Sequence, residues 1–314
     1  MNSVQRQDNC ESCPVVAHHS PRFDLDDPEQ ARGLLSYLEE HGYGVVASVA
    51  SAEDIERAKT QFWDAAEDYR PGLKRNDTST WDDDNWLANP ATGIIFGRPF
   101  NHSDFLWNTR LLPKVRRAFE LVWGAEIAAD CDEGMLVSFD GGNAFRPWAL
   151  NPLWATTGGW WHVDQNARNP NRTGRVCVQG LVTYTDAGPA AGGLCVIPGS
   201  HRHHDALCAR APGARVSADF VPVPEGDPLL RGAAGRLVCA AAGDLILWDS
   251  RTVHCNTPAL ALAAPAPAPA AGFACASAPA DAAASCAAES CAAGPSTAGP
   301  SAAVAPPPPA AAAA

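Results

Sequence analysis

The first part of the chain alternates helical and extended hydrophobic patterns. Over residues 26–41 the leucines recur at helical spacing and Gly42 follows them, which predicts an amphipathic helix that ends at this glycine. The β-branched stretch "YGVVASV" comes next and predicts a strand. Ser51 and Asp54 then form a capping-box pattern in front of a second helix that reaches Tyr69.

The pattern changes after a third expected helix over residues 111–124. Beyond it the hydrophobic stretches are short and are bounded by turn residues, which is typical of strands. The expected strands lie in residues 134–145, 174–187, 192–201, 218–224, 235–244 and 245–254. Helices followed by many short strands favour an α+β protein in which the helices buttress a β-sandwich or jelly roll.

Composition divides the chain unevenly. From residue 259 onward it consists mainly of Ala, Pro, Ser and Gly, with one aromatic residue, Phe273, and neither lysine nor arginine. Such a segment cannot bury enough apolar area to offset the conformational entropy lost on ordering. We therefore expect a flexible N-terminus over residues 1–21, one domain over residues 22–258 and a disordered low-complexity tail over residues 259–314.

Charge and targeting signals exclude several classes of partner. The 314 residues carry a net charge of −12 without a basic stripe, which argues against nucleic-acid and anionic-membrane partners. No apolar run approaches the roughly 18 residues of a membrane span, and no secretory signal pattern opens the chain. Eleven cysteines without an export signal fit reduced thiols. We expect a cytoplasmic protein with a small-molecule partner.

The stretch "WWHVDQN" contains a candidate metal motif. His162 and Asp164 are two residues apart, so an extended strand points both side chains to the same face. A second histidine, His254, ends the last expected strand. Two imidazoles and one carboxylate are the ligands of a non-haem Fe(II) facial triad, which leaves coordination positions open. Zinc catalysis with the same ligands, or two core histidines without a metal, are the alternatives.

Three other clusters carry residue types that bind metals. The histidines within residues 201–204 follow a glycine and are expected to face solvent. Cys10 and Cys13 form a single pair without the second pair that a zinc site requires. The acidic run over residues 82–84 is expected to be a solvated loop.

Three longer motifs together resemble the phytanoyl-CoA dioxygenase family. They are "GGWWHVDQN", "LVTYTDAGPAAGGLCVIPGSH" and "GDLILWDSRTVHCN", and with the opening "HGYGVVASVASAEDIERAK" the resemblance spans about residues 35–258. It implies a double-stranded β-helix, or jelly roll, that uses Fe(II) and the co-substrate 2-oxoglutarate. His162, Asp164 and His254 would then hold the iron. The implied reaction converts 2-oxoglutarate to succinate and CO₂ and hydroxylates a small organic substrate.

One expected residue is missing. The family anchors the distal carboxylate of 2-oxoglutarate with an arginine shortly after the second histidine, but "CNTPALALAAPAP" contains no basic residue. Arg175, which shares a strand face with Gln179, is the first candidate replacement. Arg251 is expected to point away from the metal unless a bulge turns it, and Arg146 is a weaker candidate. Asn256 could hydrogen-bond the co-substrate.

Two further explanations of the missing arginine remain open. The Ala/Pro tract could replace the last core strand, which would leave an unpaired sheet edge, or the protein could bind a metal without 2-oxoglutarate. The alternative function is therefore a truncated or catalytically impaired jelly-roll relative that binds metal or ligand without turnover. In either case Trp160, Trp161 and Trp248 are expected to shape an apolar pocket or to pack in the core.

Overall fold

The computed structural model describes residues 13–124, 137–211, 217–224 and 226–260. Cys10 and the part of the expected tail from residue 261 onward lie outside these ranges. In the described part of the chain, no helix is both long enough and apolar enough to cross a membrane.

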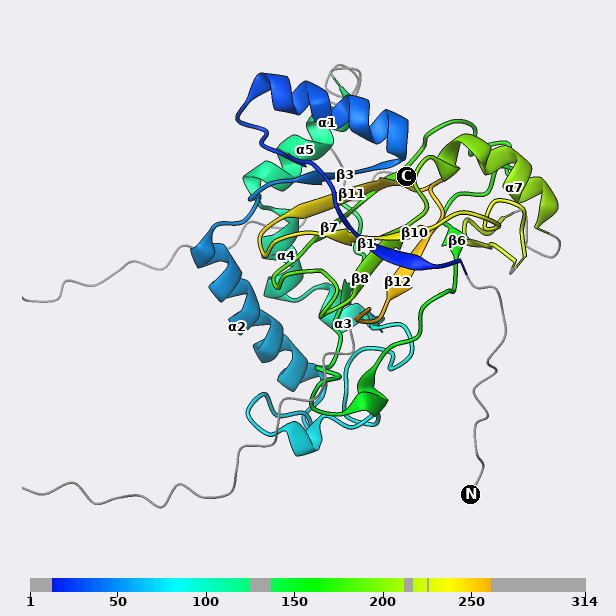
Figure 1. Ribbon diagram of the computed structural model, residues 1–314. Coiled ribbons are helices and arrows are strands. Elements are labelled where there is room, and N and C mark those ends of the chain that lie inside the picture. Colours follow the sequence, from blue (N-terminus) through cyan, green and yellow to red (C-terminus); the bar gives the residue numbers. More distant parts are fainter. Residues whose placement is uncertain (1–12, 125–136, 212–216, 225, 261–314) are drawn as a thin grey trace, which may run out of the picture. The chain divides into compact units, whose positions relative to one another are not determined.

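The three helices expected from the hydrophobic pattern are present (Figure 1). Helix α1 (Pro28–His41) starts where the Asp27 side chain accepts hydrogen bonds from two backbone N–H groups, and it ends at Gly42, whose φ of 78° is left-handed. Helix α2 (Ala52–Tyr69) begins with the expected capping box of Ser51 and Asp54. Helix α5 spans Pro113–Trp123.

Three short helices were not expected. Helices α3 (Arg98–Asn101) and α4 (Asp104–Arg110) lie between α2 and α5 in the chain, and α7 (His204–Arg210) follows the histidine cluster. Each is at most seven residues long, which is too short for a helical hydrophobic period to stand out from the sequence.

Two mixed sheets form the centre of the fold. The first has the order β1-β10-β8-β12-β6-β9 and the second the order β2-β3-β11-β7. The first comprises β1 (Val15–His19), β10 (Gly235–Cys239), β8 (Gly193–Val196), β12 (His254–Thr257), β6 (His162–Val163) and β9 (Val221–Pro222). The second comprises β2 (Arg22–Phe23), β3 (Tyr43–Val46), β11 (Leu245–Asp249) and β7 (Val178–Val182). A separate ribbon pairs β4 (Ile94–Ile95) with β5 (Gly142–Asn143). The expected α+β class is confirmed.

The expected flexible N-terminus over residues 1–21 is wrong for residues 15–19. These residues form β1, which pairs in parallel with β10 over its whole length. The N–H and C=O groups along the edge of β10 can bond a further strand, and the β-branched start of β1 suits that position.

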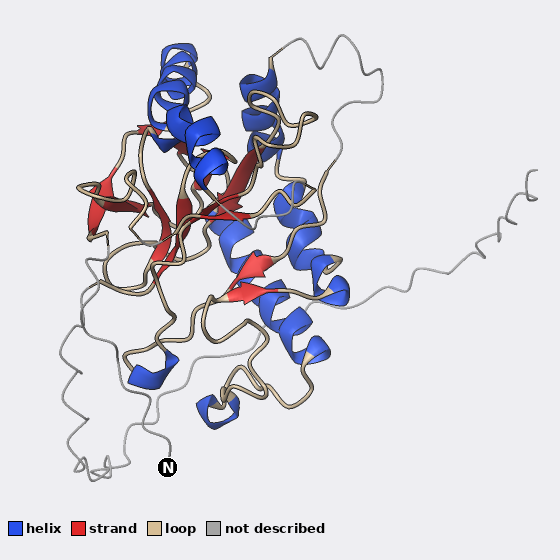
Figure 2. Cartoon of the chain, turned by 90° about the vertical axis from the view of Figure 1, so that its right-hand side faces the viewer, coloured by secondary structure: helices blue, strands red, loops and turns tan. Residues whose placement is uncertain are grey.

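The two sheets enclose a hydrophobic interior, and helices cover their outer faces. The interior cluster consists of Tyr43, Val45, Leu194, Val196, Val238, Ala240, Ile246 and Trp248. Figure 1 shows α1 and α5 beside β3 and β11, and Figure 2 shows the helices outside the strands. The leucines of α1 and the apolar face of α5 pack there against the outer face of β11.

Strand β7 has a hydrogen-bonded neighbour on one side only, β11, within the described ranges. Every open sheet ends in such strands, so this edge does not distinguish the explanation in which the Ala/Pro tract replaces the last core strand, and that explanation stays a prediction. The tract itself lies outside the described residues beyond Leu260.

A buried carboxylate fixes the start of β11. Asp244 is fully buried and accepts two hydrogen bonds of 2.7 Å from the Arg22 guanidinium. Its oxygens also accept from the backbone N–H groups of Ser48 and Ala241. The pair therefore joins β2 to the turn that leads into β11.

We expect Arg22→Met to lower the free energy of unfolding by about 2–3 kcal/mol, because the change leaves Asp244 as a buried charge without its counter-ion. Arg22 is partly exposed, so the loss falls below that of a fully buried pair. Urea denaturation measures it. Arg32→Met, at an exposed position on α1, is the control and should change the value by less than about 0.5 kcal/mol. Equal effects of the two changes would contradict the prediction.

Candidate metal centre

Two strands bring the predicted metal ligands together. In the antiparallel pairing of β12 with β6, His254 lies directly opposite His162. Asp164 follows β6, and its backbone N–H donates to the carbonyl of Ser250 in the turn before β12 (2.9 Å). One ligand atom from each of the three side chains lies within 4.8 Å of the other two. No other cluster of this kind occurs within the described ranges.

Backbone carbonyls orient both imidazoles. Nδ1 of His162 lies 3.2 Å from the carbonyl oxygen of Trp160, and Nδ1 of His254 lies 2.9 Å from that of Thr252. A carbonyl oxygen only accepts, so each Nδ1 carries the proton. In the neutral form of each ring, Nε2 then carries the lone pair that a metal can bind.

The two Nε2 atoms face one carboxylate. His162 Nε2 lies 3.6 Å from Oδ1 of Asp164, and His254 Nε2 lies 3.4 Å from Oδ2. Burial, and next the charge of His254, lower the pKa of His162 to about 4. Burial acts to raise the pKa of Asp164. The hydrogen bond from His254 to this carboxylate, and the interaction of the carboxylate with the charged forms of both imidazoles, outweigh burial and lower the pKa of Asp164 to about 2. At neutral pH His162 is thus a neutral imidazole and Asp164 is a carboxylate.

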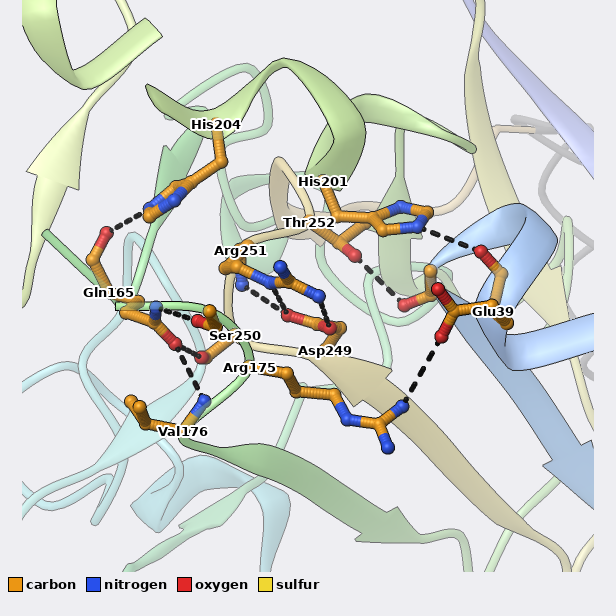
Figure 3. A network of polar contacts seen from close by, with 12 residues as sticks. Glu39, Gln165, Arg175, Val176, His201, His204, Asp249, Ser250, Arg251 and Thr252 are labelled. Atoms are coloured by element: carbon orange, nitrogen blue, oxygen red, sulfur yellow. Dashed lines mark hydrogen bonds and ion pairs between the residues drawn. The ribbon is translucent and has the colours of Figure 1, made fainter. Parts of the chain in front are cut away.

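Neighbouring amides hold the acidic ligand in place. Nε2 of Gln179, on β7, donates to Oδ2 of Asp164 (2.9 Å). Gln165, which follows Asp164 in the chain, is fully buried. Its Nε2 donates to the backbone carbonyls of Arg172 and Gly174. Its Oε1 accepts from Ser250 Oγ and from the Val176 N–H (Figure 3). The loop after β6 is therefore fixed by contacts on both sides of the carboxylate.

The histidines after Gly199 do not face solvent as expected, except for His203. His201 and His204 are buried, and each bonds a backbone carbonyl, that of Glu39 at 3.0 Å and that of Gln165 at 2.6 Å (Figure 3). They hold helix α1 and the loop after β6 against the turn that leads into α7. Their role is structural, and they are not part of the metal cluster.

Aromatic rings enclose His162. Trp160 stacks on one side of the imidazole (centroids 5.0 Å apart) and Phe220 lies within 4.6 Å. Phe220 was not among the expected site residues, although it lies in a predicted strand whose Pro222 pairs with His162. For Trp161 both a pocket and core packing were expected, and it packs in the core: its ring lies against Gly235 in a buried cluster on the other side of the strand.

The candidate arginines all bind other partners. Arg175 lies 3.7 Å from a carboxylate oxygen of Glu39 and over the ring of Trp123. Arg251 makes two hydrogen bonds with its neighbour Asp249 (Figure 3). These contacts lie with α1, α5 and Asp249 at the end of β11, and a co-substrate role for Arg175 or Arg251 stays a prediction.

Arg146 is a structural residue. Its side chain is buried, bonds Asp83 and the carbonyl of Trp81, and lies over the rings of Trp86 and Trp154. The acidic run over residues 82–84 is exposed, as expected, but one of its carboxylates neutralises this arginine.

Asn256 lies two residues beyond His254 and is buried. Its Nδ2 donates to the carbonyl of Thr92 (3.1 Å) and to Oδ1 of Asn143 (2.9 Å). Both amide hydrogens are thus used, and only Oδ1 remains for another contact. An acceptor cannot bond a carboxylate, so this side chain ties β12 to β5 and offers a co-substrate an acceptor alone.

Known proteins resemble this chain over most of the described range. A family model described as "Phytanoyl-CoA dioxygenase (PhyH)" matches residues 38–258. The "Ava biosynthesis cluster protein O" of Aspergillus versicolor is 29% identical over 250 residues, which are 76% of this chain and 77% of that protein. A "Putative phytanoyl-CoA dioxygenase" of Dictyostelium discoideum is 26% identical over 197 residues, 52% of this chain and 54% of that one.

Solved structures are similar at low sequence identity. The epimerase SnoN in complex with Fe³⁺, alpha ketoglutarate and nogalamycin RO has a TM-score of 0.45 and 14% identity, and the match covers 74% of this chain and 78% of SnoN. EctD from S. alaskensis with 2-oxoglutarate and 5-hydroxyectoine has a TM-score of 0.47 and 17% identity, with 82% and 80% covered.

The pKa of His162 predicts how stability changes with pH in the metal-free protein. The imidazole is neutral in the fold with a pKa of about 4, against 6.5 ordinarily, so its contribution is complete above the ordinary value and is lost as pH falls through about 4. We expect protonation of His162 to lower the free energy of unfolding by about 3 kcal/mol between pH 7 and pH 4. Urea denaturation across this range should show a smaller decline for His162→Gln. Parallel curves for the two proteins would refute this.

Proposed function

The chain belongs to the phytanoyl-CoA dioxygenase family, and on that basis we propose that it is an Fe(II)- and 2-oxoglutarate-dependent dioxygenase that hydroxylates a small organic substrate. The observation that carries the proposal is the convergence of His162, Asp164 and His254 from two paired strands and an adjoining loop.

The donor set fits ferrous iron. Two neutral imidazole nitrogens and one carboxylate on one side of a metal are the protein ligands of non-haem Fe(II) oxygenases, which leave positions open for small ligands. The 3.4 and 3.6 Å separations between the carboxylate and the two Nε2 atoms allow one ion to contact all three groups. Bound iron with a 2-oxo acid would supply the oxidising power for hydroxylation by O₂.

The remaining residues orient and shield these ligands. Carbonyls of Trp160 and Thr252 fix the ring tautomers, and Gln179 fixes the direction of the Asp164 carboxylate. Such outer partners tune the affinity of a metal site. The rings of Trp160 and Phe220 cover the faces of the His162 imidazole, which limits the access of water to that ligand.

We assign the two facing sheets to a double-stranded β-helix buttressed by the N-terminal helices. The metal ligands then lie on strands that face the interior, at the level of Trp248 on the opposite sheet. Residues 22–258 form the domain that carries this function. Strand β1, from residues 15–19, belongs to the same sheet and extends the domain toward the N-terminus. A cytoplasmic location remains a prediction.

The substrate class is a small organic molecule. A relative named for a biosynthesis cluster supports this class without identifying a compound, and the family name does not make phytanoyl-CoA the substrate. The alternative, a relative that binds metal without turnover, is favoured by one observation: the chain has no lysine or arginine after Arg251.

We expect His254→Ala to abolish the weak visible charge-transfer band that appears when anaerobic Fe(II)-loaded protein is titrated with 2-oxoglutarate. Loss of a direct ligand should weaken Fe(II) binding by more than the roughly 10- to 100-fold that loss of an outer-shell partner costs. His203→Ala, at an exposed histidine, is the matched control and should keep the band.

Three results are distinguishable in this titration. A band that depends on His254 supports the dioxygenase. Iron binding without a band supports the relative that does not turn over. Unchanged Fe(II) affinity in His254→Ala would return both histidines to a structural role.

A further inference from the structure

Trp248 presents an unused hydrogen-bond donor beside the metal centre. It lies on β11, its ring centroid is 5.5 Å from that of His254, and its side chain is only 9% exposed. Its Nε1 finds no acceptor among the described residues. A buried N–H without a partner costs free energy, so an acceptor supplied by a ligand would relieve that cost.

Its direct neighbour across the sheet presents an unused acceptor. Gln179 is the register partner of Trp248 in the pairing of β11 with β7, so the two side chains lie on the same face. Nε2 of Gln179 bonds Asp164, whereas its Oε1 is buried and has no donor among the described residues. The residues that carry one free donor and one free acceptor are thus cross-strand neighbours, and each contacts a metal ligand.

A guanidinium also lies on the interior face. Arg236 is two strands from His254, because it pairs with Val196, which in turn pairs with His254. Its Nη1 lies 3.5 Å from His18 on β1. Burial raises the pKa of Tyr43 and a hydrogen bond with Arg236 acts to lower it, so the guanidinium lies beside the Tyr43 hydroxyl. Tyr43 is the other register partner of Trp248, so Arg236 is the rival anchor that the test must separate from the neutral pair.

We propose that the N–H of Trp248 and Oε1 of Gln179 form the subsite for the far end of the 2-oxo acid co-substrate, in place of an arginine. The inference rests on the proposed function, because it requires a metal that binds the 2-oxo acid group. A donor and an acceptor match a neutral group such as a primary amide, whose oxygen accepts and whose N–H donates. The subsite therefore does not select 2-oxoglutarate by the charge of its distal carboxylate.

The test is a binding measurement on the full chain loaded with Mn(II), which takes the place of Fe(II) without turnover. Calorimetric titrations compare 2-oxoglutarate, 2-oxoglutaramate, in which an amide replaces the distal carboxylate, and pyruvate, which has no distal group. We expect the amide to bind at least as tightly as 2-oxoglutarate, and pyruvate to bind about 5- to 10-fold more weakly, the equivalent of about one neutral hydrogen bond.

Single substitutions identify the anchor. Trp248→Phe should weaken the two longer acids about 5- to 10-fold and leave pyruvate and Mn(II) binding unchanged, because only the indole N–H is lost. Trp63→Phe, in the cluster between α2 and α4, controls for the loss of a tryptophan. Arg236→Gln should leave all three titrations within about 2-fold.

Different results would overturn the inference and the proposed function. Binding of 2-oxoglutarate that is more than about 10-fold tighter than binding of the amide would show a charged anchor and overturn this inference alone. Loss of 2-oxoglutarate binding in Arg236→Gln would show the same. No effect of Trp248→Phe would do the same. Failure of the unmodified protein to bind Mn(II) would overturn the proposed function and, with it, the inference.

Discussion

The register between β6 and β12 is the constraint on which the site depends. His162 and His254 face each other because these strands pair at that position. A slip of one residue would turn Trp161 or Val253 toward the interior and move a histidine into the hydrophobic layer on the other face. Both residues are buried in that layer. Its apolar packing therefore sets the register, and the register sets the distance between the imidazoles.

Strand β6 is only two residues long, so side-chain contacts must supply the order that a longer ladder would give. Gln165 supplies most of it by bonding Ser250 and the segment that leads into β7. The pair of Arg251 and Asp249 fixes the turn before β12 in the same way. The buried amide of Gln165 is bonded at both its nitrogen and its oxygen, which is the condition under which a polar network stabilises one conformation.

The charge around the triad depends on which carboxylates the arginines of the fold bind. Arg22, Arg146, Arg175 and Arg251 each have a carboxylate partner outside the triad. The groups left unbonded beside the metal ligands are neutral, the indole N–H of Trp248 and the amide oxygen of Gln179. Arg236 differs from these four arginines, because its side chain lies beside His18 and the Tyr43 hydroxyl.

The sequence alone determined the long helices, the strand-rich second part and the spacing of His162 and Asp164, because these depend on period, capping and spacing within one element. Tertiary structure decided the rest. The facing of His162 and His254, the burial of His201 and His204, and the partner of Arg175 each depend on another element far away in the chain. Trp161 and Trp248 show the difference well. Only the paired sheets reveal that one packs in the outer layer while the other points its ring toward His254.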